Sequence, residues 1–167
     1  MENGVSPMKS TWIVLSLVGL SLAGCQRGPD TAVKVQQDVA EAQRDGAKDV
    51  AEAQREASQD VADARRAEER TLASTSPASD PMSPGNQANE ARANTLHEEA
   101  EARYKVETEE ADAAYKVAKE RCNAFGGDQK KSCIDNAQAE HDAKLVSAKS
   151  KRETAMREAD HLDQPRL

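Results

Sequence analysis

The sequence predicts an all-α protein: a long amphipathic hendecad-repeat helix, a flexible linker, and a disulfide-stapled antiparallel helical hairpin. Three observations carry this prediction. Charged residues make up 32% of the 167-residue chain, and much of the rest is alanine, a composition typical of long helices and coiled coils. A seven-residue motif recurs every eleven residues, and two cysteines flank a glycine pair between amphipathic stretches. High charge with few aromatic residues also favours disorder, so each segment is judged on its own pattern.

Residues 1–24 are expected to be a signal peptide. Lys9 precedes an apolar run over 12–21, and Leu22-Ala23-Gly24 leads directly to Cys25. A basic residue, a short apolar core and a cleavage site of small residues are typical of secretion signals. A transmembrane helix is the competing interpretation, but it needs roughly 20 apolar residues, more than this run provides.

The tetrapeptide that ends at Cys25 resembles the lipobox of bacterial lipoproteins. The resemblance implies that the Cys25 thiol receives a diacylglyceryl group and that Cys25 becomes the mature N-terminus, whether translation starts at Met1 or Met8. Such an anchor carries two or three acyl chains, palmitate among them, which hold a protein stably where one chain binds only marginally. In enterobacterial lipoproteins an aspartate after the cysteine causes inner-membrane retention. Gln26 stands there, which implies the inner leaflet of the outer membrane, facing the periplasm.

Residues 25–30 are expected to be a tether, and residues 31–70 a helix about 60 Å long. The motif over 38–44 recurs at 49–55 and, loosened, at 60–66. Because eleven residues make three turns, the apolar side chains share one nearly straight stripe. Each repeat also places an acid three residues before its arginine, a pairing worth about 0.2–0.5 kcal/mol. The stripe comprises Val35, Val39, Ala42, Gly46, Val50, Ala53, Ala57, Val61 and Ala64.

This stripe is thin, so two arrangements of the repeat helix are left open. The helix either stands alone in solvent or forms the seam of a loose oligomer. Gly46, inside the helix, is expected to cost about 1 kcal/mol of helix stability. Residues 71–89 are expected to be a flexible linker, because three prolines at 77, 81 and 84 exclude a continuous helix. The linker is expected to separate the repeat helix from a second helical unit.

That second unit, residues 90–162, is expected to be two long helices joined by a tight turn, followed by a tail over 163–167. Gly126 and Gly127 stop the first helix, and Asp128 is placed to cap the second. Arg152 interrupts the second apolar stripe. The two stripes comprise Leu96, Ala100, Tyr104, Ala111, Tyr115, Ala118, Cys122 and Phe125, and then Ile134, Ala137, His141, Leu145, Ala148, Ala155, Ala159 and Leu162.

With Cys25 assigned to lipid, Cys122 and Cys133 remain as an even pair in an oxidising compartment, which predicts a disulfide. It would close a short loop and stabilise the fold by about 2–3 kcal/mol. A redox pair or metal site is the alternative, but a redox pair is more typically Cys-x-x-Cys, and no histidine lies close enough in sequence to complete a zinc site.

The bridge predicts the hairpin register, in which facing residue numbers sum to about 255, as 122 and 133 do. Tyr115 then meets residues 139–141, and His141 is placed to form a hydrogen bond with it. The same register sets acidic side chains of one helix against basic side chains of the other, which favours antiparallel pairing although each exposed pair is worth about 0–1 kcal/mol. These are Glu98, Glu99, Glu101, Glu107, Glu109 and Glu110, opposite Lys144, Lys149, Lys151, Arg152 and Arg157.

No catalytic, metal or cofactor site is expected, and no small-molecule substrate. His97, His141 and His161 share no metal-ligand spacing, and solvated helices offer no pocket that would shift carboxylate pKa values apart. The net charge of −7 disfavours nucleic acid as a partner, and it also disfavours electrostatic binding to anionic lipid head groups.

The stretch Tyr115–Cys122, with Cys133 eleven residues on, resembles small alanine-rich envelope lipoproteins of Gram-negative bacteria, loosely termed TolA-like. The resemblance implies a membrane-anchored periplasmic protein with a structural, spacer or interaction role, whose partner is an envelope protein or a second copy. The alternative is an adaptor or chaperone-like module that uses the apolar face of the hairpin. The chain lacks the globular domain of TolA and the C-terminal lysine of Braun-type lipoproteins, so neither function is carried over.

Overall fold

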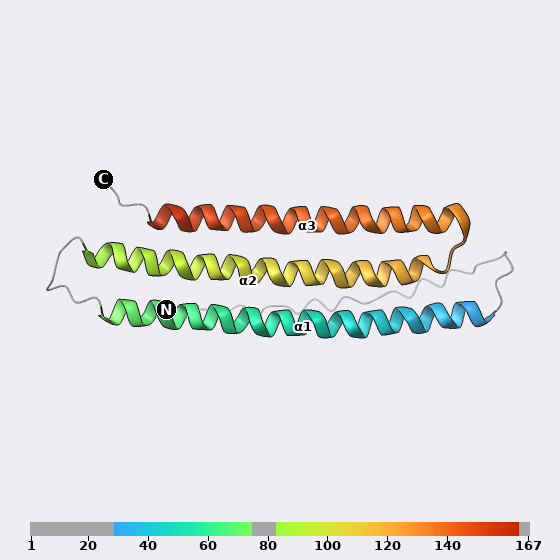
Figure 1. Ribbon diagram of the computed structural model, residues 1–167, viewed down its shortest axis with the longest axis horizontal. Coiled ribbons are helices and arrows are strands. Elements are labelled where there is room, and N and C mark those ends of the chain that lie inside the picture. Colours follow the sequence, from blue (N-terminus) through green and yellow to red (C-terminus); the bar gives the residue numbers. More distant parts are fainter. Residues whose placement is uncertain (1–28, 75–82, 164–167) are drawn as a thin grey trace, which may run out of the picture.

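The computed structural model describes residues 29–74 and 83–163, and these form three long helices (Figure 1). They are α1 (Pro29–Ser74, 46 residues), α2 (Ser83–Cys122, 40 residues) and α3 (Gly127–Asp163, 37 residues). At 1.5 Å per residue, α1 is about 69 Å long. The described residues contain no strand, so the predicted all-α class is confirmed.

The helices lie side by side in one layer with alternating direction, and α2 lies in the middle (Figure 1). Both outer helices pack along α2, whereas no described Cα atoms of α1 and α3 come within 8 Å of each other. The layer therefore has two ends. The turn end comprises the start of α1 (residues 29–38) and the α2–α3 turn region (residues 119–131). The far end comprises residues 65–74, 83–99 and 155–163.

The expectation that the repeat helix forms a separate unit is wrong, because α1 docks on α2 along its length. The predicted stripe is confirmed as the face toward α2: Gly46, Ala53 and Ala57 are buried. The helices approach so closely that a Cβ atom on Gly46 would lie 2.7 Å from the Cβ of Ala113. Neither a solitary solvated helix nor an oligomer seam describes this arrangement.

The docking is possible because α2 carries two stripes of small residues. Ala100 and Ala111 are buried toward α3, as predicted, and Thr95 and Ala102 are buried toward α1. Residues two apart differ by about 200° around a helix, so Ala100 and Ala102 lie on opposite sides. The second stripe was missed because it alternates with the first over the same stretch of sequence.

The predicted linker is too long by several residues at both ends. Residues 71–74 continue α1, and residues 83–89 form the first two turns of α2. Pro84 is compatible with helix because it lies in the first turn, where its missing N–H has no intrahelical partner to lose. Pro77, Pro81, the expected signal peptide, Cys25 and the C-terminal residues 164–167 lie outside the described residues.

The α2–α3 turn is closed by backbone hydrogen bonds in which the N–H groups of residues 123–125 donate to carbonyls three residues earlier. Gly127 then adopts a φ of 54°, a left-handed conformation that glycine accepts without strain. The carbonyl of Gly126 accepts from the N–H of Lys130 at 3.4 Å, and α3 begins at Gly127. Asp128, the predicted cap, instead lies in the first turn, where its charge favours the helix dipole.

Cys122 and Cys133 are joined by a disulfide, with their Cα atoms 5.6 Å apart, directly behind this turn. The structure also confirms the predicted register of the hairpin. The rings of Tyr115 and His141 lie 5.0 Å apart, and Lys151 pairs with Glu107 at 3.0 Å. Acidic side chains of α2 thus meet basic side chains of α3, as the register requires.

The ion pairs differ in detail from the expected ones. Of the three acid–arginine pairs expected within α1, Asp63–Arg66 forms, whereas Arg44 and Arg55 each donate Nε to the backbone carbonyl four residues earlier. An exposed ion pair is worth so little that such local contacts compete with it. Glu99, expected to face α3, pairs with Arg65 of α1 at 2.7 Å.

Two lysines of α2 form ion pairs with acidic side chains of α1. Lys116 donates to Asp49 at 3.0 Å, and Lys105 pairs with Glu56. The pKa of Lys116 is raised from its ordinary value of 10.5, first by the hydrogen bond to Asp49, and Glu56 raises the pKa of Lys105 in the same way. Both lysines are exposed, so each pair adds a small, solvent-screened contribution to the docking of α1.

This charge pairing predicts a pH dependence. A lysine whose pKa is raised on folding stabilises the fold fully below its unfolded pKa, and the contribution disappears as the pH rises through the folded value. We therefore expect the difference in thermal midpoint between the wild type and the D49N/E56Q variant to be constant from neutral pH to pH 10.5 and to shrink above it. Circular dichroism on both sides of that pH measures this difference. A difference that persists at the higher pH would contradict the pairing.

Candidate interaction site

The predicted site residues fall into separate places. The two bridged cysteines lie at the turn, and the lipidation candidate lies outside the described residues. His97 pairs with Asp160 at 3.0 Å near the far end. Within residues 29–74 and 83–163 there is no group of three or more side chains that could hold a metal ion. In the same ranges no helix is both long enough and apolar enough to span a bilayer.

His141 lies in the alanine interface of the hairpin, where its predicted hydrogen bond to Tyr115 does not form. The imidazole packs against the Tyr115 ring at an interplanar angle of 30°, and its Nε2 atom lies 2.5 Å from Asp112 Oδ1. The Oδ1 atom of Asp142 lies 3.4 Å from Nδ1, which makes no hydrogen bond. This half-buried polar contact favours one register between the alanine-rich stripes of α2 and α3.

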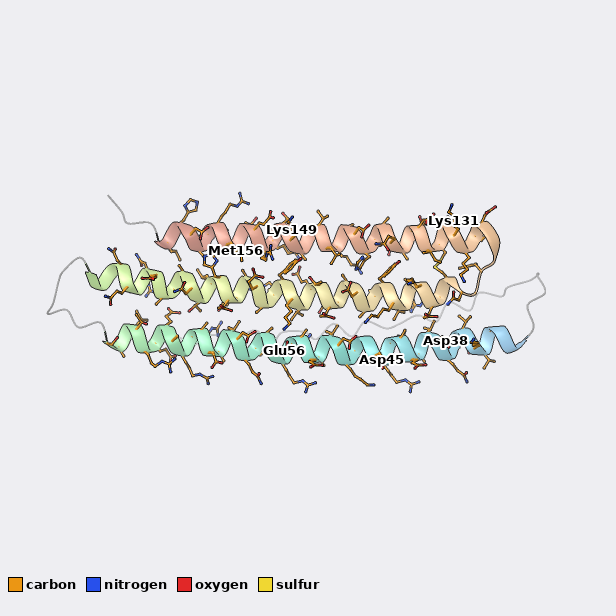
Figure 2. All side chains as sticks on the ribbon, viewed as in Figure 1. Asp38, Asp45, Glu56, Lys131, Lys149 and Met156 are labelled. Carbon is orange, nitrogen blue, oxygen red and sulfur yellow. A yellow bond between two sulfur atoms is a disulfide. The ribbon has the colours of Figure 1, made fainter. Side chains whose placement is uncertain are left out.

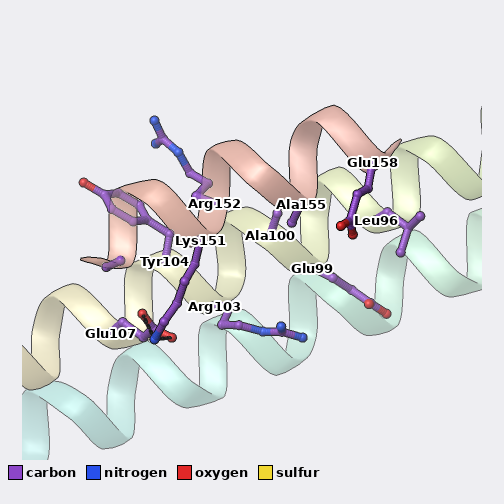
Figure 3. A pocket seen from close by; sticks show the side chains of 11 residues that line it. Leu96, Glu99, Ala100, Arg103, Tyr104, Glu107, Lys151, Arg152, Ala155 and Glu158 are labelled. Carbon is purple, nitrogen blue, oxygen red and sulfur yellow. Dashed lines mark hydrogen bonds and ion pairs between the residues drawn. The ribbon is translucent and has the colours of Figure 1, made fainter. Parts of the chain in front are cut away.

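Arg152, the interruption in the α3 stripe, covers an aromatic ring. Its guanidinium Cζ atom lies 4.5 Å from the centre of the Tyr104 ring, and Nη1 lies 3.5 Å from Glu101 Oε2. A guanidinium over an aromatic face is attracted by the negative charge density of the ring. The pair closes one end of a small pocket between α2 and α3 (Figure 3).

Two adjoining pockets make up the strongest candidate for an interaction site. The α2–α3 pocket has a volume of about 160 Å³, and a wider pocket between α1 and α2 has about 450 Å³. Leu96 and Glu99 line both, so the two pockets adjoin across α2, and we call them together the Leu96 groove. Its other residues are Ala100, Arg103, Tyr104, Glu107, Ala148, Lys151, Arg152, Ala155 and Glu158, and then Arg65, Glu68, Glu69, Leu72, Arg92 and Thr95.

The groove is apolar in its floor and charged at its rim. Leu72 is 38% exposed and Leu96 is 36% exposed. The rim charges pair with one another: Arg92 lies 3.7 Å from Glu68, and the Arg65–Glu99 and Lys151–Glu107 pairs flank it. The groove thus presents exposed leucines from α1 and α2 within a charge-balanced border. Leu162 of α3, 40% exposed, lies at the same end of the layer but lines neither pocket.

Sequence reasoning found part of this site. The apolar face of the hairpin, which the adaptor alternative uses, contains Leu96, Ala100 and Tyr104, and all three line the groove. The α1 side was missed because Leu72 fell in the expected linker, whereas it lies two residues before the end of α1.

Comparisons with known proteins add no relative. No family model, no curated protein and no solved structure matches this chain.

Proposed function

We propose that this chain is a lipoprotein of the cell envelope, anchored by lipid at Cys25 and facing the periplasm. The observation that carries the proposal is the lipobox-like tetrapeptide at 22–25, which ends four residues before α1 begins at Pro29. The Cys122–Cys133 disulfide supports an oxidising compartment. The outer membrane is the proposed location, from Gln26 after the cysteine.

We further propose that the three-helix layer acts as a spacer or interaction arm and not as an enzyme. Its length supports this role, because α1 begins near the anchor and ends about 69 Å away. Many of its charged side chains form exposed ion pairs between and along the helices, as for Lys116 with Asp49. Such solvated pairs suit a structural surface.

The second candidate function is an adaptor that binds an envelope protein or a second copy of the chain. The Leu96 groove favours it, because the exposed leucines lie at the far end, away from the anchored residue. An apolar patch with a polar border is typical of a protein-binding surface.

Replacing Cys25 with alanine is expected to abolish acylation and partitioning into the detergent phase, while the helical circular dichroism signal of the folded part stays unchanged. Mass spectrometry of the native wild-type product provides the direct check. An unmodified amino terminus in that product would overturn the proposed anchor.

Photo-crosslinking in intact envelopes separates the two roles. A cross-linking side chain at position 96 is compared with one at position 146 on the outer face of α3, where Val146 is 69% exposed. A defined partner captured only from position 96 supports the adaptor, and no specific capture from either position supports the spacer.

A further inference from the structure

The fold brings together two segments that are far apart in sequence. The start of α1 lies at the same end of the layer as the α2–α3 turn (Figure 1). Cys25 precedes Pro29 by four residues, and four residues span at most about 14 Å. A lipid on Cys25 therefore holds this end, and not the far end, next to the bilayer.

The turn has the chemistry of a membrane contact. Phe125 is the only phenylalanine of the chain, and it is 44% exposed at the tip of the layer. Residues 119–131 contain four basic and two acidic side chains, although the chain as a whole carries a net charge of −7. Residues 29–38, at the start of α1, contain one basic and two acidic side chains, so the turn end as a whole has five basic and four acidic side chains. The acidic excess therefore lies elsewhere along the layer, and the turn itself is basic.

The local geometry keeps these side chains at the tip. The disulfide and the left-handed Gly127 hold residues 123–126 in a tight turn beyond the ends of α2 and α3. Lys131 projects from the start of α3 on the side away from α2 (Figure 2), and Arg121 is exposed on the last turn of α2. The exposed aromatic ring can enter the lipid interface while basic side chains of the same turn region face the head groups.

We propose that the turn end docks on the bilayer as a second membrane contact beside the lipid anchor. Phe125 enters the interfacial region, where aromatic rings are favoured, and Arg121, Lys130 and Lys131 face anionic phospholipid head groups. This inference rests on the proposed anchoring at Cys25. A single flexible tether leaves the layer free to tilt, whereas two contacts at one end restrict it and point the Leu96 groove away from the membrane.

A tryptophan at the tip tests the contact. The only tryptophan of the sequence, Trp12, lies in the expected signal peptide, so F125W gives the mature protein one fluorophore. In the lipidated protein on phosphatidylethanolamine–phosphatidylglycerol vesicles, we expect blue-shifted F125W emission that is quenched by acyl-brominated lipids. The matched variants V146W, in the middle of α3, and L72W, at the far end, should keep the emission of water-exposed tryptophan.

The charge component has its own test. Each basic residue near an anionic surface is expected to change the ratio of docked to undocked tip about five-fold. In the F125W background, K130Q/K131Q should therefore reduce the quenching on anionic vesicles, and vesicles of phosphatidylcholine alone should reduce it in the same way. Unchanged thermal midpoints confirm that these substitutions leave the fold intact.

The outcomes distinguish this inference from the proposed function. A protein that floats with vesicles but shows no quenching of F125W retains its anchor and overturns the docking. Equal quenching of F125W and V146W means that the layer lies flat, which also overturns it. Quenching that K130Q/K131Q and neutral vesicles leave unchanged overturns the role of the anionic head groups. A product without lipid on Cys25 overturns the anchor itself.

Discussion

Replacing Gly46 with alanine is expected to destabilise the protein by about 1–3 kcal/mol, as overpacking of a tight interface does. The same change at an exposed helix position stabilises by about 0.5–1 kcal/mol, because glycine is a poor helix former. The interface overrides this preference: the new Cβ atom would lie 2.7 Å from the Cβ of Ala113 and 3.2 Å from its Cα. The Cα belongs to the backbone of α2, so α1 must move away. Denaturant unfolding followed by circular dichroism measures the loss.

Two further variants make the Gly46 prediction specific. Gly85 also lies in a helix, but a Cβ atom there would have nothing within 4 Å, so G85A is expected to be neutral or slightly stabilising. Removing the opposing methyl group with A113G should recover part of the stability lost in G46A. If G46A were as stable as G85A, the close approach of α1 and α2 at this point would be refuted.

Removing the disulfide with C122A/C133A is expected to lower the free energy of unfolding by about 2–3 kcal/mol. The bridge closes a loop with a sequence separation of 11 residues and so restricts the unfolded chain. Cys122 is also the largest fully buried side chain of the described residues, and its truncation leaves space behind the turn. For a domain of this size the loss corresponds to a drop of about 5–10 °C in the thermal midpoint.

Chemical reduction provides an independent measurement of the stabilisation by the disulfide. The reduced wild type should unfold near the midpoint of C122A/C133A, and the reductant should leave the variant unchanged. Hydrogen exchange should report the earliest opening at the ends of α2 and α3 next to the turn, because the bridge holds these ends. If the thermal midpoint of the wild type were the same before and after reduction, with free thiols confirmed by titration, a stabilising disulfide would be ruled out.

Much of the hairpin could be predicted from sequence because its information is local or covalent. The spacing of Ala137, Ala148 and Ala159 by eleven residues predicts one buried face, and all three are buried. The cysteine pair predicts the register, which the Tyr115–His141 contact confirms. The prediction for Asp128 was wrong because capping depends on backbone angles: α3 begins one residue earlier, at the left-handed Gly127, and Asp128 lies inside the first turn.

The Leu96 groove as a whole could not be predicted in this way. Its two pockets adjoin because α1 and α3 both pack beside Leu96 of α2, and that depends on two registers at once. The cysteines specify only the register between α2 and α3. Nothing covalent specifies the register between α1 and α2, which follows from the fit of Gly46 against Ala113 and from the Arg65–Glu99 pair.

The amino-acid sequence alone determined three helices, the alanine stripe on the α1 face and the pairing of α2 with α3. Periodicity and a cysteine pair act over short stretches of chain, so they can be recognised without knowing what lies nearby in space. The tertiary structure alone decided that α1 folds back on α2, that α2 is covered on two opposite sides, and that the anchor end and the turn coincide. These features depend on contact between surfaces that are distant in sequence, where a single missing methyl group at Gly46 decides whether two helices can approach.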